Sequence, residues 1–409
     1  MATLKKNITS LVVVQLLTYI IPLLQIPYLT RVLGIQSYSL FAYALILTQM
    51  ANIVTDFGLN LYLPQKIASG KNGRVQLGRY YAAAMLIKLA LLIPVCLAFF
   101  ALVITNDKYN DNLIFFSLFF IGVVGNAFSL LWLYQGLEKI YIYSRIFISI
   151  KAVSLVAIVL LVEKQQDINL LGFINGIQPL ILFAILAAIA SKKYNVKIRK
   201  TTFRKVKIIF KDSLDYFTSR AFVSIYTAGC GLFLGYFGTA HQLSYYNAAE
   251  QLYRSAQQVF NPFSQALYPY MARTKDYRVF FKITLLCIAI CLTGIAFGYF
   301  CGEILISLLY GADFAAAYSV LLIFLVALLF NTLAVLLGYP ALVPLNLSRV
   351  ANRSVIYAGS LQIIMLGVLY YMFKPITAEQ VAFTVVICEF IVMTLRGLAL
   401  NKGLKNEVR

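Results

Sequence analysis

The membrane character of the chain is clearest in residues 80–105, which read YYAAAMLIKLALLIPVCLAFFALVIT. Lys88 is the one charged side chain in this stretch. A helix needs about 20 mainly apolar residues to cross the hydrocarbon core of a bilayer. Residues 80–105 are therefore long enough and apolar enough to form a membrane-spanning helix.

Similar apolar stretches occur along the whole chain, and together they predict twelve membrane-spanning helices. The second, seventh and eighth carry the most polar residues, as expected of helices that line a polar cavity. The predicted fold class is therefore an all-α polytopic membrane protein. The predicted spans are residues 11–33, 38–60, 80–105, 113–134, 146–162, 170–190, 214–237, 243–270, 282–301, 318–338, 354–373 and 381–400.

The composition excludes most soluble proteins. Of the 409 residues, 61% are hydrophobic and 12% are charged, and the mean hydropathy is +0.82. A soluble domain is about 45–50% apolar and about 25% charged. A soluble enzyme, a disordered protein and a nucleic-acid-binding module are thus excluded. The six cysteines lie in or beside apolar stretches without a nearby metal-ligand set, so we expect no disulfide framework, no metal site and no cofactor.

The net charge of +20 comes from 35 Lys and Arg against 15 Asp and Glu. Because the basic residues lie between apolar stretches, we interpret them as contacts to membrane lipids and as determinants of topology, not as a nucleic-acid surface. With the N-terminus in the cytoplasm, 27 of them fall in inward-facing segments and their flanks, among them Arg396 with the C-terminal tail, and four fall in outward-facing segments. The positive-inside rule then predicts that both termini are cytoplasmic. The four outward-facing residues are Arg31, Lys108, Lys164 and Lys374.

The longest and most basic connection divides the chain near its middle. Residues 192–211 contain nine Lys and Arg, with six predicted spans on either side. This arrangement is typical of transporters built from two halves. We predict an N-terminal six-helix bundle over residues 1–200, including the start of the basic linker, and a C-terminal one over 201–409. A faint similarity between residues 37–44 and 243–249 favours the same division.

Apart from the residues counted with the inward- and outward-facing segments and their flanks, four basic residues fall inside predicted spans, where each costs about 2.5–3.5 kcal/mol at a helix centre. Lys151 lies near the predicted cytoplasmic end of its span, so we expect it to extend to the interface. Lys88, Arg220 and Arg254 lie deeper. For these three we predict a role as cations that bind an anionic substrate in a water-filled cavity.

Acidic and aromatic residues accompany these cations. Glu250 and Arg254 are one helical turn apart, so they can form an ion pair. That pair either only neutralises itself, or Arg254 receives a substrate anion while Glu250 holds Arg254 in place or exchanges a proton. Asp56 is a second candidate for ion coupling or charge pairing; Asp215 and Glu389 are the other carboxylates at membrane level. Tyr245 and Tyr246 are predicted to stack on sugar rings near the cations.

Five short motifs occur in the first two-thirds of the chain: TRVLG (30–34), DFGL (56–59), WLYQGLEK (132–139), SYYNAAE (244–250) and PFSQALYP (262–269). In this order they resemble the motifs of polysaccharide flippases of the O-antigen (Wzx) type, in the multidrug/oligosaccharidyl-lipid/polysaccharide exporter superfamily. The junction after Gly34 departs from the family pattern, because residues 35–37 read IQS where many relatives have Pro, Glu and Gly.

The resemblance implies two six-helix bundles around a central cavity, in the inner membrane of a bacterium. It implies a flippase that moves undecaprenyl-diphosphate-linked oligosaccharide repeat units across this membrane by alternating access, coupled to an ion gradient, in O-antigen and lipopolysaccharide biosynthesis. The polymerase and the chain-length regulator of the same pathway are expected partners. For Arg31, near the outer end of helix 1, we expect a contact on the release side.

Three alternatives stay open on the sequence. A small-molecule cation exporter of the same superfamily would have an acidic cavity, whereas the membrane-level charges here are mainly basic. A membrane polymerase or ligase of the same pathway would carry a large outward loop, and the predicted outward loops are short. A scaffolding membrane subunit would leave the arginines within the spans unexplained.

Overall fold

The computed structural model describes the backbone of residues 2–68 and 73–407. It describes the side chains of residues 24–67 and 73–405, except those at positions 215, 219, 220, 225 and 226. No strand occurs in the described ranges, so the predicted all-α class is confirmed. The chain divides into two compact units, Met1–Ala221 and Phe222–Arg409.

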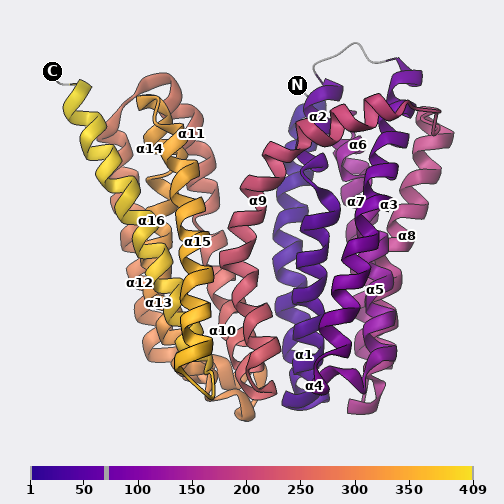
Figure 1. Cartoon of the computed structure of the whole chain (residues 1–409). Coiled ribbons are helices and arrows are strands. Elements are labelled where there is room, and N and C mark those ends of the chain that lie inside the picture. The colour runs from indigo at the N-terminus through magenta and orange to yellow at the C-terminus, as the bar shows by residue number, and fades with distance from the viewer. Residues whose placement is uncertain (1, 69–72, 408–409) are drawn as a thin grey trace. The chain divides into compact units, whose positions relative to one another are not determined.

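The N-terminal unit consists of long helices that run side by side with short ones at their ends (Figure 1). Within it, α5 packs closely on α8, and α1 contacts α7, α5 and α3. Its elements are α1 (Ala2–Asp56), α2 (Leu59–Ala68), α3 (Arg74–Ile104), α4 (Asp107–Asn110), α5 (Leu113–Ala127), α6 (Leu131–Gly136), α7 (Ile140–Leu161), the short helix Gln165–Asp167, α8 (Ile168–Tyr194) and the first part of α9 (Phe203–Phe237).

The C-terminal unit is a second helical bundle. Helix α13 packs on α16, α10 and α12, and α15 packs on α16. The unit begins inside α9 and continues through α10 (Ala240–Gln258), α11 (Asn261–Thr274), α12 (Tyr277–Tyr310), the short helix Ala312–Phe314, α13 (Ala317–Leu336), α14 (Tyr339–Leu342), the short helix Val343–Leu345, α15 (Ser348–Met372) and α16 (Ala378–Glu407).

Helix α1 covers the first two predicted spans and is interrupted at Gly34. The backbone there has φ 67° and ψ 175°, outside the helical region. Glycine adopts a positive φ without the steric penalty that other residues meet. The interruption falls between the predicted spans 11–33 and 38–60, where the sequence predicts a junction. The side chains of the first 23 residues lie outside the described part of the chain.

Nine segments of the described residues are long and apolar enough to cross a membrane. The chain is thus a multi-pass membrane protein, but the number twelve is not confirmed. The predicted spans 214–237 and 243–270 are helical yet do not belong to the nine. The second of these is two helices, because α10 ends at Gln258 and α11 begins at Asn261, directly before Pro262.

The first part of α9 packs on the N-terminal unit, at the DFGL motif. The ring of Phe57 stacks on Phe210 at 4.3 Å and on Phe217 at 4.6 Å between centroids. Gly58 has φ 74°, and a Cβ atom there would lie 2.7 Å from the carbonyl oxygen of Ser213. The predicted boundary at residues 200 and 201 therefore differs from the structural one between Ala221 and Phe222. These contacts attach the start of α9 to the preceding helices.

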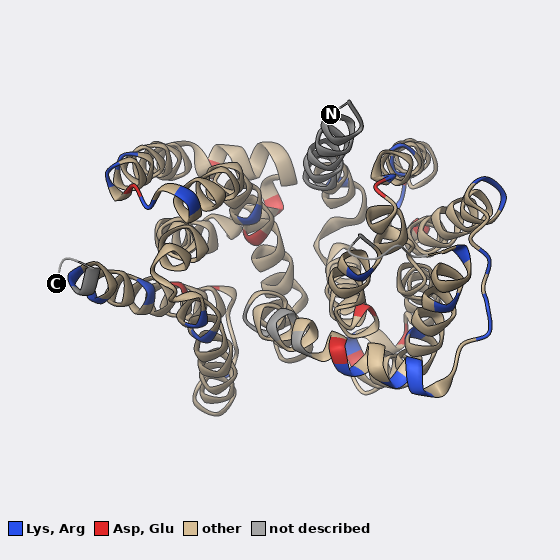
Figure 2. Ribbon diagram, turned by 90° about the horizontal axis from the view of Figure 1, so that it is seen from above, with Lys and Arg blue, Asp and Glu red and all other residues tan. Residues whose placement is uncertain are grey.

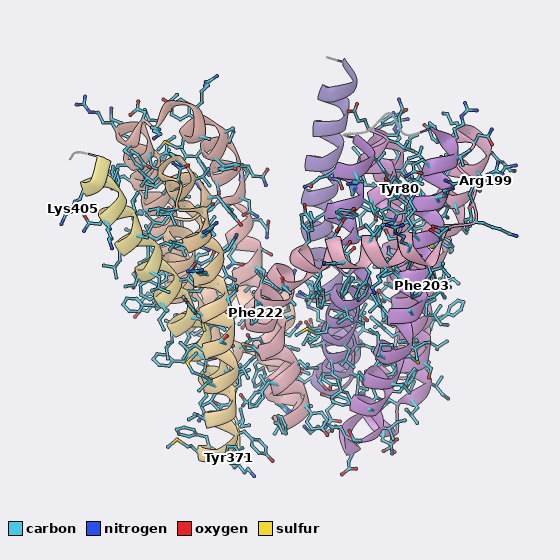
Figure 3. The ribbon with its side chains drawn as sticks, turned by 45° about the horizontal axis from the view of Figure 1, so that its top comes forward. Tyr80, Arg199, Phe203, Phe222, Tyr371 and Lys405 are labelled. Carbon is cyan, nitrogen blue, oxygen red and sulfur yellow. The ribbon has the colours of Figure 1, made fainter. Side chains whose placement is uncertain are left out.

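The basic start of α9 also contacts α3. The Lys205 ammonium lies 4.5 Å from the centroid of the Tyr80 ring, within the range of a cation–π interaction. Burial lowers the pKa of Lys205, and the positive charge of Arg79 lowers it further. Figure 2 shows Lys and Arg along the connection between α8 and α9, and Figure 3 shows Tyr80, Arg199 and Phe203 in the same region.

The WLYQGLEK motif fills the core of the N-terminal unit. Trp132 is fully buried and its ring meets Tyr81 edge-on at 6.2 Å. The Tyr134 hydroxyl donates a 2.7 Å hydrogen bond to the carbonyl oxygen of Leu186 in α8. A Cβ atom at Gly136 would lie 2.9 Å from Ile67 in α2. The motif therefore joins α6 to α2, α3 and α8.

Glycines allow α5 and α8 to approach closely. A Cβ atom at Gly176 would lie 2.0 Å from the carbonyl oxygen of Leu118, and one at Gly125 would lie 2.5 Å from the backbone nitrogen of Leu180. Small residues at such a contact permit close helix packing inside a membrane. This contact positions the polar side chains of both helices next to α1 and α7.

Candidate functional site

Lys88 and Asp56, which the sequence places in different helices, lie together in the N-terminal unit. Lys88 in α3 is 1% exposed, and its ammonium donates a 3.4 Å hydrogen bond to the carbonyl oxygen of Ser129. The Asp56 carboxylate, at the end of α1, attracts this ammonium. One Asp56 oxygen also accepts a hydrogen bond from the backbone of Asn60 at 3.2 Å. The buried ammonium thus has a carbonyl acceptor and an attracting carboxylate in its own unit.

A cavity of about 250 Å³ lies among α1, α5, α7 and α8 of the N-terminal unit. Its polar lining comes from Thr48, Asn126, Lys151, Asn175 and Gln178, one or two residues from each helix. No Asp or Glu belongs to the described residues that line it. The arrangement offers amide groups, a hydroxyl group and one positive charge, and so suits an anionic or hydroxylated ligand.

Two polar atoms of this lining have unmet hydrogen-bonding capacity. Gln178 is 4% exposed, and its Oε1 atom has no hydrogen-bond partner among the described residues. The Thr48 hydroxyl oxygen is also buried, and it too has no hydrogen-bond partner among the described residues. Buried polar atoms are nearly always hydrogen-bonded, to protein or to a bound molecule. The cavity is therefore built for a polar occupant.

Lys151 does not behave as the sequence predicts. The predicted span begins at residue 146, close enough for Lys151 to reach the interface, but α7 begins at Ile140. At 1.5 Å per residue, Lys151 lies roughly 16 Å along a helix that ends at Leu161. Its side chain lines the cavity, with the ammonium 6.0 Å from the centroid of the Phe147 ring. The expectation that it extends to the interface is thus wrong.

The ion pair that the spacing of Glu250 and Arg254 predicts is present in α10. Arg254 Nη2 donates to Glu250 Oε1 over 2.9 Å, with exposed side-chain fractions of 28% and 11%. The half-buried guanidinium has four further N–H donors that can serve a second anion. The ion pair is thus a feature of the C-terminal unit alone, and its role in substrate binding stays a prediction.

Tyr246 lies one helical turn before Glu250 in α10. It is fully buried, and its ring meets Phe324 of α13 at 5.4 Å. Tyr253 stacks on the same Phe324 ring at 4.9 Å. Tyr245 is half-buried and meets His241 and Phe314 edge-on. Tyr246 therefore supports α10 from within the core, whereas Tyr245 keeps part of its ring exposed.

Two charged residues of α16 are buried in the C-terminal unit, although the sequence suggests solvation for one of them. Arg396, which the topology count assigns to the cytoplasmic tail, is 9% exposed. It donates to the Ser354 hydroxyl at 2.9 Å and to the carbonyl oxygens of Ala334 and Ala351 at 2.6 and 3.0 Å. Glu389 is 3% exposed and accepts a 3.0 Å hydrogen bond from Asn331.

The remaining predicted site residues either lie apart from the two charge pairs or have side chains outside the described residues. Arg31 is exposed on α1 in the N-terminal unit, near Tyr28, whose hydroxyl donates to the carbonyl oxygens of Val159 and Val162. The side chains of Arg220 and Asp215 lie outside the described residues. The structure therefore brings together Lys88 with Asp56 and Glu250 with Arg254.

Sequence comparison assigns the chain to a family. Residues 4–275 match the family described as "Polysaccharide biosynthesis protein". The chain belongs to this family. An Escherichia coli (strain K12) protein named "Putative O-antigen transporter" is 25% identical over 401 residues, covering 96% of this chain and 95% of the relative. A Shigella dysenteriae protein of the same name is 24% identical over 315 residues, covering 76% of this chain and 79% of the relative.

Structural comparison finds the fold of this chain in solved membrane transporters. An inward-facing multidrug resistance MATE family transporter has a TM-score of 0.72 and 12% identity, over 94% of this chain and 93% of the other. The lipid II flippase MurJ, in an inward closed conformation, has a TM-score of 0.74 and 14% identity, over 95% and 87%. At these identities the likeness shows the fold, and the predicted superfamily resemblance is confirmed at that level.

Proposed function

We propose that this family member is a flippase that moves undecaprenyl-diphosphate-linked oligosaccharide repeat units across the bacterial inner membrane. The observation that carries the proposal is the match along 96% of the chain to a relative named as an O-antigen transporter, on a fold shared with a lipid flippase. Both relatives are named transporters, which argues against the alternative of a polymerase or ligase.

The charges support the choice of an anionic substrate. A diphosphate and its sugars cannot cross hydrocarbon unaided, because burying an unpaired charge is prohibitively costly. Lys88 and Arg254 are cations in the helical bundles, and guanidinium groups form strong hydrogen bonds with phosphate. We assign Arg254, Lys88, Arg220 and Arg31 to the path of the head group, while the prenyl tail stays in the lipid.

Tyrosines support the sugar end of the same substrate. Tyr245 has an exposed part of its ring and is assigned to stack on sugars. Tyr246 is fully buried, so its assigned role is to position α10 and the Glu250–Arg254 pair. The alternative of a small-cation exporter lacks support, because basic residues outnumber carboxylates among the residues assigned to the substrate path and to ion coupling.

Energy for the cycle is assigned to an ion gradient, with exposure alternating between the two sides of the membrane. Asp56 and Glu250 each face a cation in the structure, Lys88 and Arg254. Protonation of either carboxylate would release its cation for a substrate phosphate. The termini are assigned to the cytoplasm on the distribution of basic residues. The polymerase and chain-length regulator of the pathway are the assigned protein partners.

A deletion strain tests this function through its lipid-linked intermediates. In the bacterium that makes the protein, loss of the gene should leave complete lipid-linked repeat units on the cytoplasmic leaflet, protected from a sugar-oxidising reagent added outside. Restoring the wild-type gene should remove them. If single repeat units accumulated on the outer leaflet instead, the polymerase assignment would replace the flippase.

A further inference from the structure

The cavity that contains Lys151 differs from the other charged sites of the N-terminal unit. Lys88 has a nearby carboxylate in Asp56, whereas the described residues that line the cavity provide none for Lys151. An ammonium at membrane depth is costly without a counter-charge. Lys151 therefore gains most from a ligand that brings a negative charge with it.

The remaining lining indicates what carries that charge. Asn126, Asn175 and Gln178 provide amide donors and acceptors, and the Gln178 Oε1 atom is buried without a partner in the described chain. That acceptor needs a hydroxyl or another donor on the ligand. Chloride and sulfate have no donor to offer it. A ligand with both a negative group and hydroxyl groups satisfies Lys151 and Gln178 together.

The aromatic lining and the volume of the cavity restrict the class of ligand further. Phe119, Tyr143 and Phe147 contribute flat apolar faces to the same cavity, suited to the C–H face of a ring. A cavity needs roughly 10–15 Å³ of this kind of volume to hold one water molecule, so about 250 Å³ has room for a sugar ring and its substituents. One positive charge matches a carboxylate better than a diphosphate.

We propose that this cavity binds one acidic sugar residue, with Lys151 on the sugar carboxylate and Gln178, Asn175 and Asn126 on its hydroxyl groups. The inference deepens the proposed function, on which it rests for the role of the site. As part of a flippase, the cavity would select repeat units that contain a sugar acid. Thr48, on α1, lies where its hydroxyl can join the same network.

Binding to the purified full-length protein tests this site directly. Glucuronate and glucose are the probes, since they differ in the carboxylate, and thermal stability and ligand-detected NMR are the readouts. Glucuronate should raise the melting temperature and give saturation transfer, with glucose at least tenfold weaker. Lys151→Gln should abolish the glucuronate effect, Lys151→Arg should keep part of it, and Gln178→Leu should weaken it.

A matched control separates the site from the general loss of a charge. Arg145 is exposed on the same helix, and Arg145→Gln should leave glucuronate binding unchanged. Equal effects of glucose and glucuronate, equal binding by Lys151→Gln, or full competition by inorganic phosphate would overturn the acidic-sugar site. The binding assay needs no transport. A chain that binds glucuronate but moves no lipid-linked oligosaccharide would overturn only the flippase, and a transporting chain that fails to bind would overturn only this site.

Discussion

Arg254 and Glu250 form an ion pair across one turn of α10, with 2.9 Å between Nη2 and Oε1. The carboxylate is the more buried partner, with 11% of its side chain exposed. Removing one partner of such a pair leaves the other charge buried without compensation. A single substitution therefore changes both the stability of the protein and its transport activity. A double substitution separates the two effects.

Arg254→Gln should reduce export of the polysaccharide at least tenfold and should also lower the melting temperature of the protein. Glu250→Gln combined with Arg254→Gln should restore the melting temperature, because no charge is then unpaired, while export stays low. Surface polysaccharide and membrane abundance are the measurements. Arg278→Gln, an exposed arginine at the start of α12, is the matched control. Full export by Arg254→Gln would remove Arg254 from the substrate path.

Lys88 and Asp56 should be energetically coupled. Each single change, Lys88→Met or Asp56→Asn, removes one member of the attractive Lys88–Asp56 interaction. Contacting residues show coupling energies of about 0.5–3 kcal/mol in double-mutant cycles. The double variant should thus be destabilised by less than the sum of the two single destabilisations, with a difference of about 0.5–3 kcal/mol. Additive effects within error would show that the two groups act independently.

Gly176→Ala should destabilise the N-terminal unit by about 1–3 kcal/mol, the usual cost of overpacking. The added Cβ atom would lie 2.0 Å from the carbonyl oxygen of Leu118, so α5 and α8 must separate. The control is Gly294→Ala in α12, where nothing lies within 4 Å of the added atom. Thermal unfolding in detergent checks both, and a stable Gly176→Ala protein would contradict the close α5–α8 contact.

Phe57→Ala should loosen the first part of α9 from the N-terminal unit. The change removes two ring stacks, with Phe210 and Phe217, and a buried Phe→Ala change costs about 3–5 kcal/mol. Limited proteolysis should cut the connection between α8 and α9 faster than in the wild type. Phe203→Ala, at a side chain that is 84% exposed, should leave the rate unchanged. Identical proteolysis rates for the Phe57→Ala and Phe203→Ala variants would contradict the packing of α9 on Phe57.

Local patterns predicted the helices and the short-range pairs well. Hydropathy places helices at all predicted spans, and Gly34 interrupts α1 where a junction is expected. The spacing of Glu250 and Arg254 predicts their ion pair, because residues four apart share a helix face. The family resemblance adds the superfamily fold, which hydropathy alone does not specify.

Long-range packing decides what the sequence could not predict. The role of Lys151 depends on where α7 begins and on polar residues from three other helices, Thr48, Asn126, Asn175 and Gln178. Arg396 looks like a tail residue until α15 and α13 supply its acceptors. Polar residues at membrane level in neighbouring spans are the one sequence signal that points to the Lys151 cavity.

Transport by the purified protein in liposomes tests the central claim most directly. Vesicles would contain the protein and a fluorescent undecaprenyl-diphosphate oligosaccharide, and an external glycosidase would report how much reaches the outer leaflet. We predict that the glycosidase rapidly reaches the substrate that starts in the inner leaflet. With Arg254→Gln this rate should be at least tenfold lower. Access no faster than in protein-free vesicles, with a folded protein and an imposed ion gradient, would contradict the flippase.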